Sequence, residues 1–189
     1  MLQRNILAIV LIACLPLAAH AADTYTTDPQ HTYANFSVNH LGYSTLLGSF
    51  EKSSGKITLD RAGKKGSVDL TLFPASVRTG LPKRDEHLKS PDFFNVAEYP
   101  EVTFKSSVLK FKGDVPVSVD GKLTILGVTK PVTLAINSFK CGAHPMNRKE
   151  LCGADASVQI KRSDFGMKFG LPDVGDEVKL VIEVEAYKD

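Results

Sequence analysis

Residues 115–136 read VPVSVDGKLTILGVTKPVTLAI, and this stretch decides the fold class. Every second residue from Val115 to Ile125 is apolar or glycine, and the residues between them are mostly polar. The alternation resumes from Val132 to Ile136, after a turn that we predict at Gly127 and Pro131. Side chains of a β-strand point alternately to its two faces, so a period of two predicts strands with one buried face. The stretch therefore predicts two antiparallel strands joined by a short turn.

The same pattern covers most of the chain. Even spacing of short strands with short turns is typical of an antiparallel sandwich or barrel. A barrel of about eight strands has an interior that side chains can fill or that can hold one ligand. These segments together predict an all-β domain of eight or nine strands. Besides the two strands above, we predict strands at residues 24–28, 34–38, 55–60, 68–72, 102–111, 154–160 and 178–184.

One long segment breaks the alternation: residues 79–100, TGLPKRDEHLKSPDFFNVAEYP. It carries two helix-start signals, the first at Pro82 and the second in the tripeptide SPD at residues 90–92. Pro100 ends any helix, because the residue before a proline is disfavoured in the α region. We therefore predict a short helical insertion at about residues 80–97, which is either a lid on a barrel or an ordinary connection. The side chains that would face a barrel are Leu81, Leu88, Phe93 and Phe94.

Residues 41–50, LGYSTLLGSF, combine glycines with large apolar side chains. Glycine inside a strand pattern indicates a bulge, a bend or the close approach of another group. The segment is therefore either a bent strand that packs internally or a loop that lines the mouth of a barrel. The side chains that would line this entrance are Leu41, Tyr43, Leu46, Leu47 and Phe50.

The chain begins with a segment typical of a secretory signal peptide. A short stretch that contains Arg4 precedes an apolar run, and the tripeptide AHA fits the small-x-small cleavage rule. We predict cleavage after Ala21, so that residues 1–21 are the signal peptide and residues 22–189 are the mature domain. The less favoured alternative is a lipoprotein signal with lipidation at Cys14, because the mature chain would then begin with an apolar tail.

The balance of charge excludes one class of partner. The full chain has 23 basic and 21 acidic residues. Loss of the predicted signal peptide, which holds Arg4 and no acidic residue, lowers the net charge from +2 to +1. Nucleic-acid binding relies on concentrated positive charge, so we expect no nucleic-acid partner. No later apolar run is long enough to span a bilayer, so we expect no transmembrane segment in the mature chain.

Two cysteines remain after the predicted cleavage, Cys141 and Cys152. An even count in an exported domain favours a disulfide, which would close a loop of about a dozen residues and stabilise the fold by roughly 3 kcal/mol. The alternative is a metal site with His144. A structural zinc site takes four ligands, however, and no fourth donor is evident nearby. We therefore expect the disulfide and no metal.

Known catalytic motifs are missing from the sequence: it has no G-x-S-x-G, H-E-x-x-H, P-loop or G-x-G-x-x-G after a strand. The densest polar cluster is Arg84, Asp85 and His87. Asp85 could orient His87 as a general base, or the three could cap and fix the helix, which is the interpretation we favour. The tripeptide RSD at residues 162–164 is interpreted as a structural turn, and His40 as a hydrogen-bonded residue of an apolar face.

Four sequence blocks, in this order, resemble the YceI family of bacterial periplasmic polyisoprenoid-binding proteins. The resemblance runs over essentially the whole predicted mature chain, and several independent blocks in the right order make it specific. The blocks are HTYANFSVNHLGYSTLLGSF at 31–50, SVRTGLPKRDEHLKSPDFFNVAEYPEVTF at 76–104, GKLTILGVTKPVTL at 121–134 and CGADASVQIKRSDFGMKFGLPDVGDEVKL at 152–180.

The resemblance implies an eight-stranded antiparallel lipocalin-like barrel in the periplasm, with a long apolar cavity and no catalytic residues. It implies no cofactor other than a bound isoprenoid lipid or quinone. The cysteine pair looks like one found in a subset of the family. Related members are often dimers, and the sequence neither supports nor excludes a homodimer. The apolar interior pattern of the strands agrees with such a cavity, because burying an unpaired charge is costly.

We therefore expect a non-enzyme that binds the polyprenyl chain of an isoprenoid lipid, or the tail of an isoprenoid quinone, as a periplasmic carrier or sequestering protein. The alternatives are a barrel filled by its own side chains, with a structural or interaction role, and an enzyme on an isoprenoid substrate that uses Asp85, His87 or His40. The candidate ligand-binding residues are Phe36, Val38, Leu41, Tyr43, Leu47, Phe50, Leu72, Leu88, Phe93, Phe94, Phe104, Phe165, Met167 and Phe169.

Overall fold

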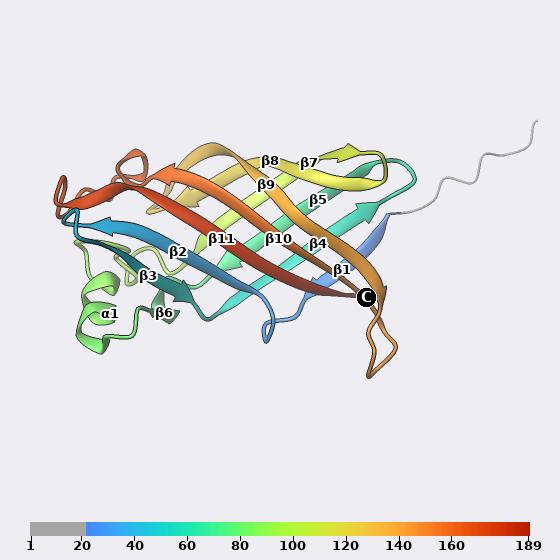
Figure 1. Ribbon diagram of the computed structural model, residues 1–189, viewed down its shortest axis with the longest axis horizontal. Helices are drawn as coiled ribbons and strands as arrows, with labels where there is room; N and C mark the ends of the chain where they lie inside the picture. Colours follow the sequence, from blue (N-terminus) through green and yellow to red (C-terminus); the bar gives the residue numbers. More distant parts are fainter. Residues whose placement is uncertain (1–21) are drawn as a thin grey trace, which may run out of the picture.

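The computed structural model describes residues 22–189, so the predicted signal peptide lies outside the described part of the chain. Within these residues the chain forms eleven β-strands, one α-helix and two short 3-10 helices (Figure 1). The strands are β1 (Asp23–Thr27), β2 (Tyr33–His40), β3 (Ser44–Phe50), β4 (Ser53–Asp60), β5 (Lys65–Leu72), β6 (Val77–Arg78), β7 (Val102–Lys112), β8 (Val115–Ile125), β9 (Val128–Ala143), β10 (Glu150–Lys161) and β11 (Val174–Lys188). The helices are η1 (Pro74–Ser76), α1 (Pro82–Lys89) and η2 (Arg162–Phe165).

Eight of the strands in residues 22–189 close into an antiparallel barrel, in the order β1-β4-β5-β7-β8-β9-β10-β11, with β11 paired back to β1. This confirms the predicted eight-stranded antiparallel barrel. The long strand β11 has two partners on one edge: its last residues pair with β1 and its earlier residues, from Val174 to Glu183, pair with β2. β2 in turn carries β3 and the short β6, so these three strands extend the wall at the end where α1 lies (Figure 1).

A β-bulge interrupts the valine alternation that was predicted at the start of β8. Val119 is buried, but Val115 and Val117 are exposed. On the β7 side, the pairing passes from Ser118 to Pro116 in one step, which leaves Val117 as an extra residue. One extra residue reverses which side chains face the interior, so Pro116 takes the buried position instead of its valine neighbours. The prediction of a single parity across this strand was therefore wrong.

The turn between β8 and β9 lies where Gly127 was predicted to mark it. Leu126 and Gly127 both have positive φ, 50° and 72°, as a two-residue hairpin turn requires. Pro131, however, lies inside β9 opposite Lys122 and not in the turn. A proline is tolerated there because the pairing of β9 with β10 begins only at Ala135, which leaves this half of the strand at an edge.

Cys141 and Cys152 form the predicted disulfide, and not a metal site with His144. The two cysteines lie opposite each other in the β9–β10 ladder, so the segment between them is a hairpin and not a loose loop. Cys152 is buried in a small apolar cluster with Tyr25. The disulfide therefore ties the end of the barrel that lies away from α1 (Figure 1).

The main core fills the barrel between β5, β7, β8 and β9, and a second apolar cluster joins β2, β3 and β6 through Ala34, Phe50 and Val77. In that second cluster, the ring of Phe36 lies across Gly48 on the neighbouring strand. A Cβ added to Gly48 would lie 2.2 Å from the Phe36 ring. The glycine of β3 therefore permits the close approach of another side chain, which was one of the interpretations of the glycine pattern.

α1 is shorter than the predicted insertion at residues 80–97. It begins at Pro82, the first of the two predicted start signals, and ends at Lys89. Ser90, which was predicted to cap a further helix, is instead the C-cap of α1, and its carbonyl accepts the amide of Asn95 at 2.9 Å. Asn95 has a φ of 43°, and this left-handed conformation is incompatible with a continuing α-helix. Turns therefore replace the second half of the predicted helical segment.

Candidate functional site: a covered apolar cavity

A cavity of about 300 Å³ lies at the α1 end of the barrel. Its walls come from β2, β3, β5, β7, β8, β10 and β11 and from η2 with the loop that follows it. Its cover comes from α1 and the turns that follow it. The volume is at the lower end of the range for small-molecule sites. The lid interpretation of the helical insertion therefore agrees with the position of α1.

The lining of this cavity is mostly apolar. Valine, leucine, isoleucine, methionine and phenylalanine account for all lining residues except His40, Arg84, His87 and Arg162. Among residues 22–189, no aspartate or glutamate lines it. An apolar group gains free energy on leaving water for such a surface, whereas a polar group loses its hydration and must find a partner among these four side chains.

Nine of the fourteen candidate residues from the sequence line the cavity. Contact with a ligand stays a prediction for all of them, but the fold brings them together from five separate segments: β2, β3, β5, the α1 segment and the loop after η2. The aromatic and leucine side chains of the α1 segment cover the cavity, and the others line its wall. The nine are Phe36, Val38, Phe50, Leu72, Leu88, Phe93, Phe94, Met167 and Phe169.

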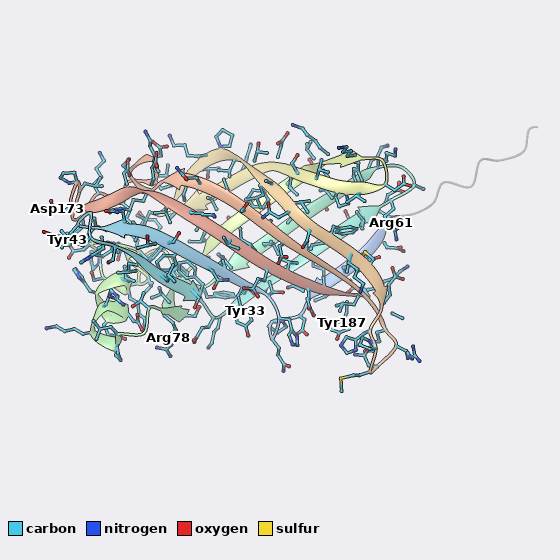
Figure 2. The ribbon with its side chains drawn as sticks, viewed as in Figure 1. Tyr33, Tyr43, Arg61, Arg78, Asp173 and Tyr187 are labelled. Carbon is cyan, nitrogen blue, oxygen red and sulfur yellow. A yellow bond between two sulfur atoms is a disulfide. The ribbon has the colours of Figure 1, made fainter. Side chains whose placement is uncertain are left out.

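Leu41, Tyr43 and Leu47 do not line the cavity. They are 49%, 91% and 67% exposed, respectively. Leu46 pairs with Val38 and lines the cavity, so the next residue along β3, Leu47, points to the opposite face. Leu41 and Tyr43 belong to the β2–β3 turn, and Tyr43 extends into solvent at the α1 end of the molecule (Figure 2). Of this segment, only Leu46 and Phe50, which the parity of β3 turns inward, line the cavity.

Three further apolar residues also lie outside the cavity lining. Phe104 and Phe165 are 7% and 2% exposed and belong to the main core of the barrel. Phe104 packs across Gly121, where an added Cβ would lie 2.4 Å from its ring. Leu81, which was predicted to face the barrel, is 50% exposed. It precedes α1, so the inward face of the helix begins after it.

Several lining residues were not among the candidates from the sequence. Val178 and Leu180 were predicted to lie on the apolar face of the last strand, so the alternation itself could have identified them. His40, Arg84, His87 and Arg162 had each been given a structural interpretation. Leu46 had been named only as a possible residue of the entrance. The remaining lining residues outside the candidate list are Val102, Leu123, Ile125, Ile160 and Val174.

Four hydrogen bonds to Thr79 fix the start of α1. The buried carboxylate of Asp85, Oδ1, accepts the Thr79 amide at 2.9 Å and the Thr79 hydroxyl at 2.6 Å. Arg84 donates from Nε to Thr79 Oγ1 at 2.7 Å and from Nη2 to the Thr79 carbonyl at 2.6 Å. Leu81, at the N-cap position, provides no side-chain capping bond. The predicted role of this polar cluster in fixing the helix is therefore what the geometry favours.

Asp85→Ala is expected to lower the free energy of unfolding by about 1–3 kcal/mol, because it leaves two partly buried Thr79 donors without their acceptor. Glu86→Ala is the matched control on the same helix. Glu86 is exposed and pairs with Lys89 at 2.9 Å, so its loss should cost about 0.5 kcal/mol or less. Urea unfolding of both variants gives the comparison, and equal losses would contradict a structural role for Asp85.

His87 is held by a different carboxylate from the one considered in the sequence. Its Nε2 lies 2.8 Å from Asp92 Oδ2, whereas Asp85 is engaged with Thr79. The His87 ring packs edge-on against Phe93 and Phe169, with ring centroids 5.1 Å apart in both cases. The Asp85–His87 pair on which the enzyme alternative relied is therefore not formed.

Arg162 anchors the loop that follows η2. It is 5% exposed and donates to four backbone carbonyls. Two of these carbonyls belong to Met167 and Phe169, at 3.2 and 2.8 Å, and both of those residues line the cavity. Burial lowers the pKa of the Arg162 guanidinium from its ordinary value. The tripeptide at residues 162–164 is thus a structural turn, as predicted, and it also shapes the wall of the cavity.

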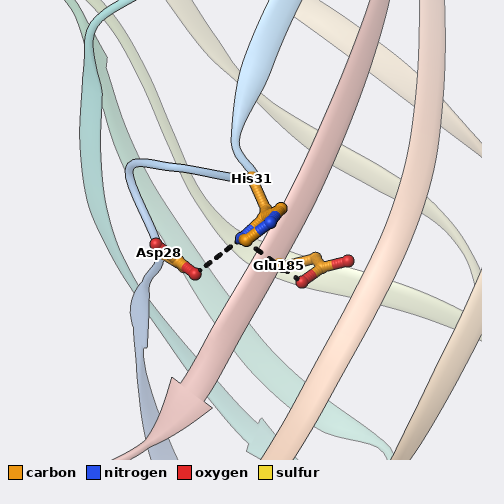
Figure 3. A group of neighbouring side chains, drawn as sticks. All are labelled: Asp28, His31 and Glu185. Carbon is orange, nitrogen blue, oxygen red and sulfur yellow. Dashed lines mark hydrogen bonds and ion pairs between the residues drawn. The ribbon is translucent and has the colours of Figure 1, made fainter.

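A separate polar group, outside the cavity lining, joins the β1–β2 turn to β11 (Figure 3). His31 Nδ1 lies 2.8 Å from Asp28 Oδ2 and 4.0 Å from Glu185 Oε2. In the described part of the chain, these three are the residues whose ligand atoms could hold a cation together, all within 4.8 Å of one another. Their geometry is already explained by hydrogen bonding within the turn, since Asp28 also accepts the Gln30 amide.

The hydrogen bond between Asp28 and His31 shifts the pKa of both side chains. It lowers the pKa of Asp28 below 3.8, with help from the Gln30 amide, and it raises the pKa of His31 above 6.5. The Asp28 contribution to stability is present above its ordinary pKa and lost as the pH falls through the lowered pKa. The His31 contribution is present below its ordinary pKa and lost as the pH rises through the raised pKa. The pair therefore stabilises the turn most between these two ordinary values.

Fold and site together define a class: an antiparallel β-barrel with a covered apolar cavity, which is the architecture of lipocalin-like proteins. Comparison with known proteins gives the family. The YceI-like domain matches residues 25–186, so the chain belongs to the YceI family. Protein YceI of Escherichia coli O17:K52:H18 is 42% identical over 171 residues, which cover 89% of this chain and 88% of that protein.

Two solved structures resemble this fold. BcnA of Burkholderia cenocepacia has a TM-score of 0.73 and 26% identity, with 84% of this chain and 98% of BcnA covered. A polyisoprenoid binding domain from Saccharophagus degradans has a TM-score of 0.66 and 18% identity, with 87% of this chain and 98% of that domain covered. At this identity, the second comparison supports the fold alone. Within residues 22–189, no helix is both long and apolar enough to cross a membrane.

Proposed function

We propose that this protein binds the tail of an isoprenoid lipid in the covered apolar cavity and acts as a carrier or sequestering protein in the periplasm. The observation that carries the proposal is the cavity itself, whose lining is apolar except for four side chains. Membership of the YceI family supports it, and so does the name of the Saccharophagus degradans domain, which describes polyisoprenoid binding by a protein of the same fold. The signal peptide predicted at residues 1–21 supports export.

The physical basis of binding is the burial of apolar surface. A branched hydrocarbon chain gains roughly 25 cal/mol for each Å² that it removes from water, and it needs no directional contact with the protein. The walls that would receive it are held by strand pairing, so the site is largely formed before the ligand arrives. The cover, in contrast, lies outside the sheet and is held by the Thr79 hydrogen bonds and by the packing of Leu88, Phe93 and Phe94 against the apolar clusters.

Two measurements test this function. The purified protein is extracted with organic solvent and the extract is analysed by mass spectrometry, where we expect a prenyl lipid or isoprenoid quinone. Calorimetric titration of delipidated protein with farnesol should then show saturable binding. Absence of any prenyl lipid in the extract, together with no binding of farnesol, would reject the proposal in favour of a barrel with a structural role.

A further inference from the structure

The four polar residues of the cavity lining all have basic side chains. Two are arginines, two are histidines, and no carboxylate from residues 22–189 joins them on the lining. Asp92 binds His87, and Asp176 binds the backbone and hydroxyl of Ser163, but neither of these acids is a lining residue. An apolar cavity with these residues offers hydrogen-bond donors and positive charge, and the acids that balance the charge lie outside it.

Arg84 is the lining residue whose donors remain available. Its guanidinium uses Nε and one Nη2 hydrogen on Thr79, at 2.7 and 2.6 Å. In the part of the chain that the structure describes, Arg84 has no hydrogen bond from Nη1 and no ion pair, and the nearby Asp85 carboxylate is joined to it only through the Thr79 hydroxyl. A guanidinium has five N–H donors in a fixed fork, so Arg84 keeps three of them for another acceptor.

The other arginine of the lining differs in this respect. Arg162 donates hydrogen bonds from Nε, Nη1 and Nη2 to four backbone carbonyls, at 2.8 to 3.2 Å. It therefore contributes charge and structure to the cavity wall, whereas Arg84 can also contribute a direct contact. Thr79 holds the Arg84 side chain in place beforehand, so little further side-chain freedom is lost when a ligand binds.

We propose that the cavity selects isoprenoid lipids with an anionic headgroup, phosphate or carboxylate, and that Arg84 is the residue that binds this headgroup. The inference rests on the proposed function, because the prenyl tail supplies the apolar contact. Guanidinium matches the geometry of phosphate and carboxylate oxygens, and hydrogen bonds between charged groups are about twice as strong as neutral ones. Selectivity for the headgroup then comes from the cover of the cavity and selectivity for the tail from its walls.

Farnesyl phosphate and farnesol provide a matched pair of probes, since they share one tail and differ in the headgroup. Calorimetric titration of the delipidated wild-type protein should give an affinity for farnesyl phosphate about tenfold or more above that for farnesol. Arg84→Met should remove this difference, because it lowers the affinity for farnesyl phosphate much more than the affinity for farnesol. Lys83→Met is the control: it removes one positive charge from the same helix, at an exposed position outside the lining, and should preserve the difference.

The outcomes separate this inference from the function on which it rests. Equal affinity of the wild-type protein for the two probes would overturn headgroup selection while the binding of prenyl lipids stands. If Arg84→Met lowered the affinities for both probes equally, the role of Arg84 would be to hold the cover in place and not to bind the headgroup. If Lys83→Met also lost the preference for farnesyl phosphate over farnesol, the preference would come from the overall positive charge of the helix and not from a direct contact with Arg84. Failure of both probes to bind the wild-type protein would reject the proposed function and this inference together.

Discussion

Arg162→Met is expected to lower the free energy of unfolding by about 3 kcal/mol or more, which makes it the most destabilising single change that we predict. The substitution leaves four backbone carbonyls without their donor, among them those of Phe169, Val174 and Gly175. Each unsatisfied acceptor costs about 1–3 kcal/mol if it stays buried. Water can reach some of these carbonyls when the loop opens, so the loss is expected to be smaller than the sum.

Two companion variants make the measurement specific. Lys161→Met removes the same charge from the adjacent exposed position and should change the urea midpoint little. Arg162→Lys keeps the charge but lacks the planar fork that reaches several carbonyls at once, so an intermediate loss is expected. A stability of Arg162→Met close to that of Lys161→Met would show that the four hydrogen bonds do not hold the loop. The loop should also gain faster amide hydrogen exchange in Arg162→Met, because its carbonyl anchors are gone.

Most strands could be predicted from the sequence because each strand turns one face to the core. Apolar residues therefore alternate with polar residues along it. It did not predict the bulge at Val117. A bulge adds one residue without changing composition, and the valines on both sides of it look alike. The position of Pro131 was wrong for a related reason. Whether a proline can lie within a strand depends on which neighbour pairs with it, and the β10 residue that pairs nearest to Pro131, Ser157, is more than twenty residues away in the sequence.

In the candidate site, too, the residues that follow a repeating pattern could be predicted, whereas those in turns and loops could not. Residues whose direction follows from strand parity or from the α1 segment, such as Phe36, Val38 and Phe93, line the cavity, and their contact with a ligand stays a prediction. Tyr43 was not, because the direction of a turn residue is set by the turn and not by a repeating pattern. The role of Arg162 could be predicted only as a structural turn. Its acceptors come from a loop whose path depends on the whole barrel, and no local pattern describes that path.

Val178→Trp is expected to weaken binding of a prenyl ligand by roughly a hundredfold. Val178 lies between Val38 of β2 and Ile160 of β10, and all three side chains line the cavity. An indole ring at this position would occupy the space between the two neighbouring strands where a tail would lie. If the ring displaces about 110 Å² of buried tail surface, then at about 25 cal/mol per Å² the loss is about 2.8 kcal/mol, or roughly a hundredfold in affinity.

Lys179→Trp is the matched control, because Lys179 follows Val178 on β11 and faces the opposite side of the sheet, where it is exposed. The chain contains no tryptophan, so each variant carries one indole that reports its own environment by fluorescence. For Val178→Trp we expect a blue-shifted emission and an affinity for farnesol that is roughly a hundredfold lower. For Lys179→Trp we expect a solvent-exposed emission and unchanged binding. Overpacking should cost Val178→Trp about 1–3 kcal/mol of stability at most, because the ring enters an existing cavity. Wild-type affinity in a folded Val178→Trp protein with a buried indole would mean that prenyl lipids bind elsewhere, and the covered cavity would then not be the binding site.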